Sequence, residues 1–307
     1  MGKKLDFAIG ILNGAIGDHL VRTDNGLAIE MAFMKDGAQV APADAAIGPR
    51  VVVLVHGLMC TESIWEFPDG DDYGARLARD HGYTPLYVRY NTGRAIFENG
   101  EALSTLLARL VAAHPGVLDE VLLLGYSMGG LVARSACHAA ATSGAPWLPL
   151  VRRAIYVGTP HQGAPLERVG RAVSRVLREI PDPYTRLIAE IADLRSEGVK
   201  DLGESPIRGE DRVDADRAAF SLREPTHPVP LLPQIRHRLI AGAVGEEPWM
   251  EALFGDAMVP VTSALGRRTS APPCEVTILR GQTHATLPHA DAVYEVITEE
   301  LSGGERP

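Results

Sequence analysis

The chain has 307 residues, of which 46% are hydrophobic and 22% are charged, and its net charge is −9. This length and composition predict one large buried core, with room for an appended cap. The acidic balance argues against a nucleic-acid partner, which would need a basic face. Cys60, Cys137 and Cys274 have no CxxC spacing, so neither a disulfide framework nor a zinc site is expected.

The N-terminus combines Lys3 and Lys4 with an apolar stretch, as a signal peptide does. Asp6, Asn13 and Asp18 interrupt that stretch, and no A-x-A cleavage site follows it. We therefore expect an amphipathic N-terminal helix and a cytoplasmic protein, in keeping with the cysteine pattern. No apolar run reaches the roughly 18 residues that a membrane span needs.

Apolar runs alternate with helical patterns along most of the chain, which predicts a mainly parallel sheet with helices on both faces. The expected strands are residues 27–33, 50–55, 84–90, 120–125, 152–158, 236–244 and 275–281. The expected helices are residues 71–81, 98–114 and 128–142, with a terminal helix from about Pro288. After Arg50, the predicted strand at 50–55 is continuously apolar, as expected for a strand buried on both faces.

Residues 161–233 differ from the rest of the chain because no apolar strand is evident in them. Apolar residues there follow helical spacing in two successive segments, and a polar stretch and a proline-rich return come after them. Asp214 and Asp216 fall in the polar part, where solvation is expected. We interpret residues 161–233 as a helical lid inserted into a single domain that spans 1–307. Packing of one or both helices directly on the core is the alternative.

Residues 125–129, Gly-Tyr-Ser-Met-Gly, match the G-x-S-x-G pattern between a predicted strand and a predicted helix. In this pattern the serine lies on a sharp strand-to-helix turn that exposes its hydroxyl group. Glycine flanks the serine because a Cβ atom on either side would crowd the turn. The pattern therefore predicts Ser127 as a nucleophile.

A serine hydroxyl becomes a good nucleophile only when a base takes its proton and an acid orients that base. On this kind of turn the partners follow in the chain order serine, acid, histidine. His284 comes directly after the last predicted strand and is the expected base, with His289 as the alternative.

The acid should lie between the last two predicted strands. Asp256 meets this requirement and is the expected acid. Glu246 and Glu247 follow the strand at 236–244 directly and remain alternatives.

When a serine attacks a carbonyl carbon, the carbonyl oxygen becomes a negatively charged oxyanion, and two backbone N–H groups are needed to bind it. Met128 begins the helix after the nucleophile, where free N–H groups and the helix dipole favour negative charge. Leu58, in the loop after the strand at 50–55, is the second expected donor, and Gly57 allows the loop to turn tightly. His56 comes too early in the chain to be the base, so we expect it to hold this loop by hydrogen bonds.

Four stretches resemble bacterial α/β-hydrolase lipases and esterases, with the PGAP1-like branch the most similar. They are VVVLVHGL (51–58), GYSMGGLVAR (125–134), VGTPHQGAPLER (157–168) and GDAMVPVTSA (255–264). The resemblance runs from about residue 50 to 300 and implies an α/β-hydrolase fold that cleaves carboxylic esters without an organic cofactor or a metal. It further implies a triad of Ser127, Asp256 and His284 with Leu58 and Met128 as oxyanion donors, and a structural role for His161.

The expected function is thus an esterase or lipase that works through an acyl-enzyme intermediate. Its substrate would be a small-molecule or lipid ester, reached in the lipid case by transient contact with a lipid interface. Cleavage of amides, thioesters or polyesters by the same triad is the main alternative. A non-catalytic binding protein is a weaker alternative, because no triad member is missing. Serine at position 127 excludes the dehalogenase and epoxide-hydrolase readings, and neither a P-loop nor an HExxH motif is present.

Overall fold

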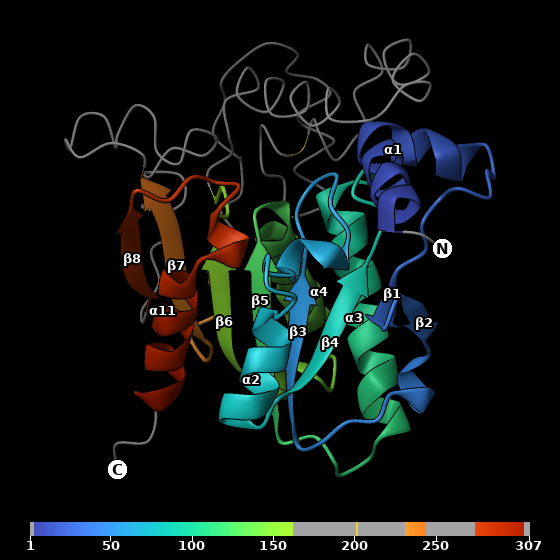
Figure 1. Ribbon diagram of the computed structural model, residues 1–307. Helices are drawn as coiled ribbons and strands as arrows, with labels where there is room; N and C mark the ends of the chain where they lie inside the picture. Colours follow the sequence, from blue (N-terminus) through green and yellow to red (C-terminus); the bar gives the residue numbers. More distant parts are fainter. Residues whose placement is uncertain (1–2, 162–200, 202–230, 244–273, 304–307) are drawn as a thin grey trace, which may run out of the picture.

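The computed structural model describes residues 3–161, 201, 231–243 and 274–303 (Figure 1). These residues form an eight-stranded sheet in the order β2-β1-β4-β3-β5-β6-β7-β8. β1 pairs antiparallel with β2 and with β4, and each pairing from β4 across to β8 is parallel. The mainly parallel sheet predicted from the sequence is therefore confirmed.

The elements follow the predicted alternation of strands and helices. The strands are β1 (Ala32–Lys35), β2 (Ala38–Val40), β3 (Arg50–Val55), β4 (Thr84–Arg89), β5 (Glu120–Tyr126), β6 (Val151–Val157), β7 (Arg236–Ala243) and β8 (Cys274–Arg280). The α-helices are α1 (Lys3–Arg22), α2 (Tyr73–His81), α3 (Ile96–Ala113), α4 (Met128–Ser143) and α11 (Asp291–Ser302). Short 3-10 helices are η1 (Pro42–Asp44), η2 (Glu62–Trp65), η3 (Leu148–Leu150) and η4 (Leu287–His289).

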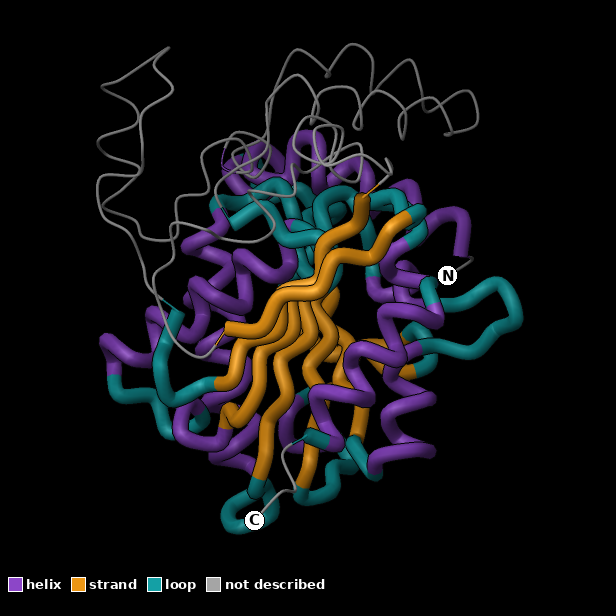
Figure 2. Tube along the Cα trace, turned by 90° about the vertical axis from the view of Figure 1, so that its left-hand side faces the viewer, coloured by secondary structure: helices purple, strands orange, loops and turns teal. Residues whose placement is uncertain are grey.

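The sheet lies between two helical layers, as Figure 2 shows. β3 illustrates the cause, because its side chains alternate between the two faces. Val51, Val53 and Val55 belong to the core cluster that contains residues of α3 and α4. Val52 and Leu54 belong to the cluster that contains residues of α2 and α11. The continuously apolar sequence of β3 thus reflects burial on both faces.

The first strand lies later in the chain than the predicted 27–33. β1 begins at Ala32 and turns into β2 through residues 36–37, both of which have positive φ. The backbone before it pairs with a helix side chain instead of a strand. Asn13 of α1 donates to Leu27 O (2.8 Å) and accepts from Ile29 N–H (2.9 Å). This tertiary contact overrides the apolar pattern of the segment.

The ends of the chain also refine the prediction. The N-terminal helix is present as α1, with a kink at Ile16 where φ is −142° and ψ is 21°. The terminal helix begins at Asp291 and not near Pro288, because residues 287–289 form the separate helix η4. His289 therefore precedes the terminal helix. Within the described ranges, no helix combines the length and the apolar character that crossing a bilayer requires.

Most of the predicted lid, residues 162–200 and 202–230, lies outside the described residues, so the lid stays a prediction. Asp201 is a described residue of this insertion, and it is buried. Its carboxylate accepts a hydrogen bond from Ile96 N–H at the start of α3 (2.9 Å). The insertion is thus joined to the body of the domain at this point.

Candidate active site

Ser127 occupies the turn between β5 and α4 with φ of +53° and ψ of −124°. A non-glycine residue with positive φ is strained, and such strain persists only where the surroundings impose it. Here Ser127 N–H donates to Val157 O at the end of β6 (2.8 Å). A Cβ atom at Gly125 would lie 2.5 Å from Gly130 Cα, so glycine is required where the strand meets the helix.

The turn packs backbone to backbone against the loop that follows β3. A Cβ atom at Gly129 would overlap Val55 O and His56 O. A Cβ atom at Gly57 would lie 3.0 Å from Ser127 Cβ. The two glycines therefore bring residues 56–60, called the oxyanion loop below after its predicted role, into contact with the serine.

His284 is the histidine that the structure brings to Ser127. Its Nε2 atom lies 2.9 Å from Ser127 Oγ, and both side chains are buried. Tyr126 O–H donates to the His284 carbonyl (2.9 Å). A Cβ atom at Gly158, where φ is +60°, would lie 3.1 Å from the imidazole ring. The alternative, His289, lies in η4 with its ring edge-on to Phe67.

The predicted acid cannot be placed beside this pair. Asp256 and its alternatives, Glu246 and Glu247, lie outside the described residues. The acid of the triad therefore stays a prediction.

The two predicted oxyanion donors belong to segments that meet at Ser127. Met128 is the first residue of α4, and the first N–H groups of a helix have no partner within the helix. Leu58 is partly buried in the loop after β3, which packs against the serine through Gly57. Their role as oxyanion donors stays a prediction.

The loop after β4 holds the oxyanion loop through contacts that the sequence reading missed. Tyr90 O–H donates to His56 O (2.7 Å), and Met59 N–H donates to Thr92 Oγ1 (3.1 Å). Met59 itself has a φ of +60°. The one sequence signal was the polar run Asn91-Thr92-Gly93 directly after an apolar strand.

His56 is a buried, neutral histidine within this loop. Burial lowers its pKa to about 4. Its ring stacks on Tyr90 with centroids 4.5 Å apart, and Nδ1 lies 3.0 Å from Gly57 O. Because a carbonyl only accepts, Nδ1 carries the proton. These contacts suit the loop-holding role expected for His56.

A second group of buried polar side chains surrounds Tyr156 on β6. Arg134 donates to His161 Nδ1 (3.3 Å), and Tyr156 lies edge-on to the His161 ring. His237 Nε2 lies 3.0 Å from Leu232 O and must donate to it, which leaves Nδ1 to accept from Tyr156 O–H (3.2 Å). Burial lowers the pKa of His237 to about 4 and that of His161 well below its ordinary value.

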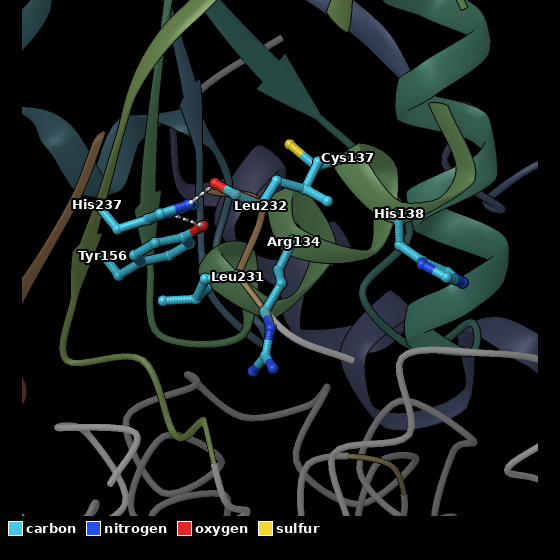
Figure 3. A pocket seen from close by; sticks show the side chains of 7 residues that line it. All are labelled: Arg134, Cys137, His138, Tyr156, Leu231, Leu232 and His237. Atoms are coloured by element: carbon cyan, nitrogen blue, oxygen red, sulfur yellow. Dashed lines mark hydrogen bonds between the residues drawn. The ribbon is translucent and has the colours of Figure 1, made fainter. Parts of the chain in front are cut away.

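A small pocket adjoins this group (Figure 3). Its lining consists of Arg134, Cys137, His138, Tyr156, Leu231, Leu232 and His237. His161 contacts Arg134 and Tyr156 of this group, and these contacts suit the structural role expected for it. Nowhere in the described part of the chain do three or more His, Cys, Asp or Glu residues gather closely enough to hold a metal ion.

Residues 52–296 match the model of the alpha/beta hydrolase family. The chain belongs to this family. The match concerns the family as a whole, so the branch suggested by the sequence stays a prediction. No curated protein matches the chain in sequence.

Two solved structures illustrate the shared fold. One is the mature lipase BlEst2 of Bacillus licheniformis, with a TM-score of 0.53 and 20% identity, covering 89% of this chain and 98% of that one. The other is the lin2722 gene product of Listeria innocua, with a TM-score of 0.52 and 16% identity, covering 84% and 95% of the two chains. These identities establish a common fold alone, so the α/β-hydrolase fold predicted from the sequence is confirmed.

Proposed function

We propose that the protein is a serine carboxylic-ester hydrolase of the esterase or lipase kind. The observation that carries this proposal is the 2.9 Å distance between Ser127 Oγ and His284 Nε2, both buried at the end of the parallel sheet. Membership of the alpha/beta hydrolase family supports it, as does the likeness to a bacterial lipase. The proposed substrate is a small-molecule or lipid ester.

The proposed reaction has two halves. Ser127 Oγ attacks the ester carbonyl carbon while its proton passes to His284 Nε2, and the carbonyl oxygen becomes an oxyanion. When the tetrahedral intermediate collapses, the carbon–oxygen bond to the alcohol breaks, and the alcohol leaves with the proton from His284. Water, deprotonated by His284, then attacks the acyl-enzyme carbonyl. The bond between the acyl carbon and Ser127 Oγ breaks, Oγ takes the proton back from His284, and the acid is released.

The other proposed site residues assist both halves. Leu58 N–H and Met128 N–H bind the oxyanion, which forms once in each half. Asp256 accepts from Nδ1–H of His284, so that Nε2 is free to take the serine proton. Loss of one backbone donor in such a site costs roughly 100- to 1,000-fold in kcat, so the position of Leu58 matters for the rate.

Replacement of the nucleophile tests the proposal directly. We expect Ser127→Ala to lower kcat for p-nitrophenyl esters on the order of 10⁶-fold, as nucleophile knockouts in a serine protease do. The variant should also lose labelling by a fluorophosphonate probe. Ser143→Ala, at the exposed end of the same helix, is the matched control and should keep both the ester hydrolysis and the labelling by the probe. Retained hydrolysis by Ser127→Ala would refute the assignment.

Replacement of the acid distinguishes Asp256 from its alternatives. We expect Asp256→Asn to lower kcat by roughly 10⁴-fold, because the amide favours the wrong histidine tautomer. Glu246→Gln and Glu247→Gln should each stay close to the unchanged protein. Steady-state kinetics on one ester measure all three variants under the same conditions. If a glutamate variant loses the rate and Asp256→Asn keeps it, the acid is that glutamate.

A further inference from the structure

The N-terminal helix forms a small core of its own with the oxyanion loop. Its buried members are Ile11, Ala15, Ile16 and Leu20 of α1, together with Met59. Leu58 is partly buried against the same cluster. Among the described residues of this cluster, the four other buried members come from α1, and Met59 comes from the loop. The apolar side of α1 is directed at the loop that carries the proposed donor.

The helix also approaches the backbone of this loop closely. A Cβ atom at Gly14 would overlap Met59 Cγ and lie 2.9 Å from Met59 Cα and 3.0 Å from Met59 N. A Cβ atom at Gly10 would lie 2.8 Å from Thr61 Cγ2. Larger residues at these two positions would push the loop away from the helix. The small residues on this side of α1 therefore set the distance between helix and loop.

Residues 91–93 contact both the helix and the loop. Asn91 Nδ2 donates to Gly17 O of α1 (2.9 Å). A Cβ atom at Gly93 would overlap Asn13 O and lie 2.6 Å from Gly17 N. Thr92, which is buried between them, accepts from Met59 N–H. Helix α1, residues 91–93 and the oxyanion loop thus pack as one unit.

The backbone of Met59 explains why the loop needs this support. Its φ of +60° lies in the left-handed region, which a side chain such as methionine adopts at a cost of roughly 1–2 kcal/mol. Without outside contacts the loop would relax toward negative φ at Met59. Such a change would rotate the two peptide groups next to Met59, and the preceding Gly57–Leu58 group, which carries Leu58 N–H, would be displaced with them.

We propose that Thr92 and helix α1 are positioning elements that hold residues 57–60 in the conformation in which Leu58 N–H can bind the oxyanion. This inference rests on the ester-hydrolase function proposed above. Thr92 lies within residues 52–296, which match the family model, whereas helix α1 lies outside them. The helical part of the support therefore comes from this chain's own N-terminal segment.

The first test replaces Thr92 in two ways. Thr92→Val keeps the shape and removes the acceptor for Met59 N–H, and Thr92→Ser keeps the acceptor. We expect Thr92→Val to lower kcat by about 10- to 100-fold and to change KM by no more than about twofold. This decrease in kcat is no larger than the decrease that follows removal of one oxyanion donor, because the donor is misplaced but still present. The Ki of a trifluoromethyl ketone, which forms a tetrahedral adduct with the serine, should rise by the factor by which kcat/KM falls. Thr92→Ser should restore both values.

The second test acts from the side of the helix. Gly14→Ala should produce the same signature, a lower kcat with little change in KM and a weaker trifluoromethyl ketone. Gly26→Ala is the matched control, because a Cβ atom there has no neighbour within 4 Å. Thermal unfolding and near-UV circular dichroism show which variants are folded. If Thr92→Val does not fold, the Gly14→Ala and Gly26→Ala pair decides the question.

A merely structural role predicts a different result. If folded Thr92→Val and Gly14→Ala have lower Tm but unchanged kcat and unchanged Ki, the positioning role is wrong. That result is distinct from failure of the proposed function. In the latter case the unchanged protein itself would neither hydrolyse esters nor react with a fluorophosphonate at Ser127, and both proposals would fall.

Discussion

The turn at Ser127 and the loop at Met59 meet in the candidate site, but they are held in different ways. Each contains a non-glycine residue with positive φ, +53° at Ser127 and +60° at Met59. Ser127 is fixed by the sheet, because it follows β5 directly and its N–H donates to Val157 at the end of β6. Met59 is fixed by Thr92 and by the packing of α1.

This difference separates the two parts of the proposed chemistry. The nucleophile takes its geometry from the neighbouring parallel strands β5 and β6. The oxyanion loop takes its geometry from side chains of distant segments. Damage to the contact between α4 and β3 should therefore harm both parts, whereas damage to α1 or Thr92 should harm the oxyanion loop alone.

The largest effect in this comparison is expected for Gly129→Ala. The new Cβ atom would overlap Val55 O and His56 O, so α4 would have to move away from β3 and carry Ser127 with it. We expect kcat/KM to fall by at least about 10³-fold, because both the nucleophile and the oxyanion donors move. The free energy of unfolding should fall by about 3 kcal/mol, the upper end of the usual cost of overpacking, because the overlap is with backbone atoms. Ester kinetics and urea unfolding measure the two effects.

Gly26→Ala again serves as the control, and it should change neither quantity. The comparison also has a ranking that can fail. If Gly129→Ala retains more activity than Thr92→Val, the turn at Ser127 does not depend on the sheet in the way described above.

The central sheet could be predicted from the sequence because burial on two faces leaves a clear pattern. After their first residues, Arg50 and Glu120, β3 and β5 contain continuous apolar runs, and each strand lies where the pattern indicates. The mostly apolar residues at 27–33 also predict a strand, but Asn13 of α1 forms hydrogen bonds with the backbone of Leu27 and Ile29. No local pattern in a sequence records a contact with a side chain from another element.

The site divides along the same line. Ser127 and His284 could be proposed as neighbours because a short motif and a chain order point to them, and the structure brings them within 2.9 Å. Thr92 could not be proposed in the same way, because its role arises from the tertiary packing of three segments. Its hydroxyl is one of many in the chain, and only the fold shows that Met59 N–H donates to it.

A smaller effect should come from pH, and it should originate in the oxyanion loop. Burial lowers the pKa of His56 to about 4, from an ordinary value of 6.5. The unfolded chain therefore binds this proton more readily than the folded protein does. The stability that His56 contributes is complete above pH 6.5 and is lost as the pH falls toward 4. The loss should amount to at most about 3 kcal/mol.

His56→Phe isolates this contribution, because the phenyl ring can still stack on Tyr90 but cannot titrate. The variant should be somewhat less stable at pH 7, since the hydrogen bond to Gly57 O is lost. Between pH 6.5 and 4, however, its unfolding free energy should fall less steeply than that of the unchanged protein. His161 and His237 keep their own contributions in both proteins, so the difference in slope belongs to His56. An equal slope for His56→Phe and the unchanged protein would contradict the buried neutral state of this histidine.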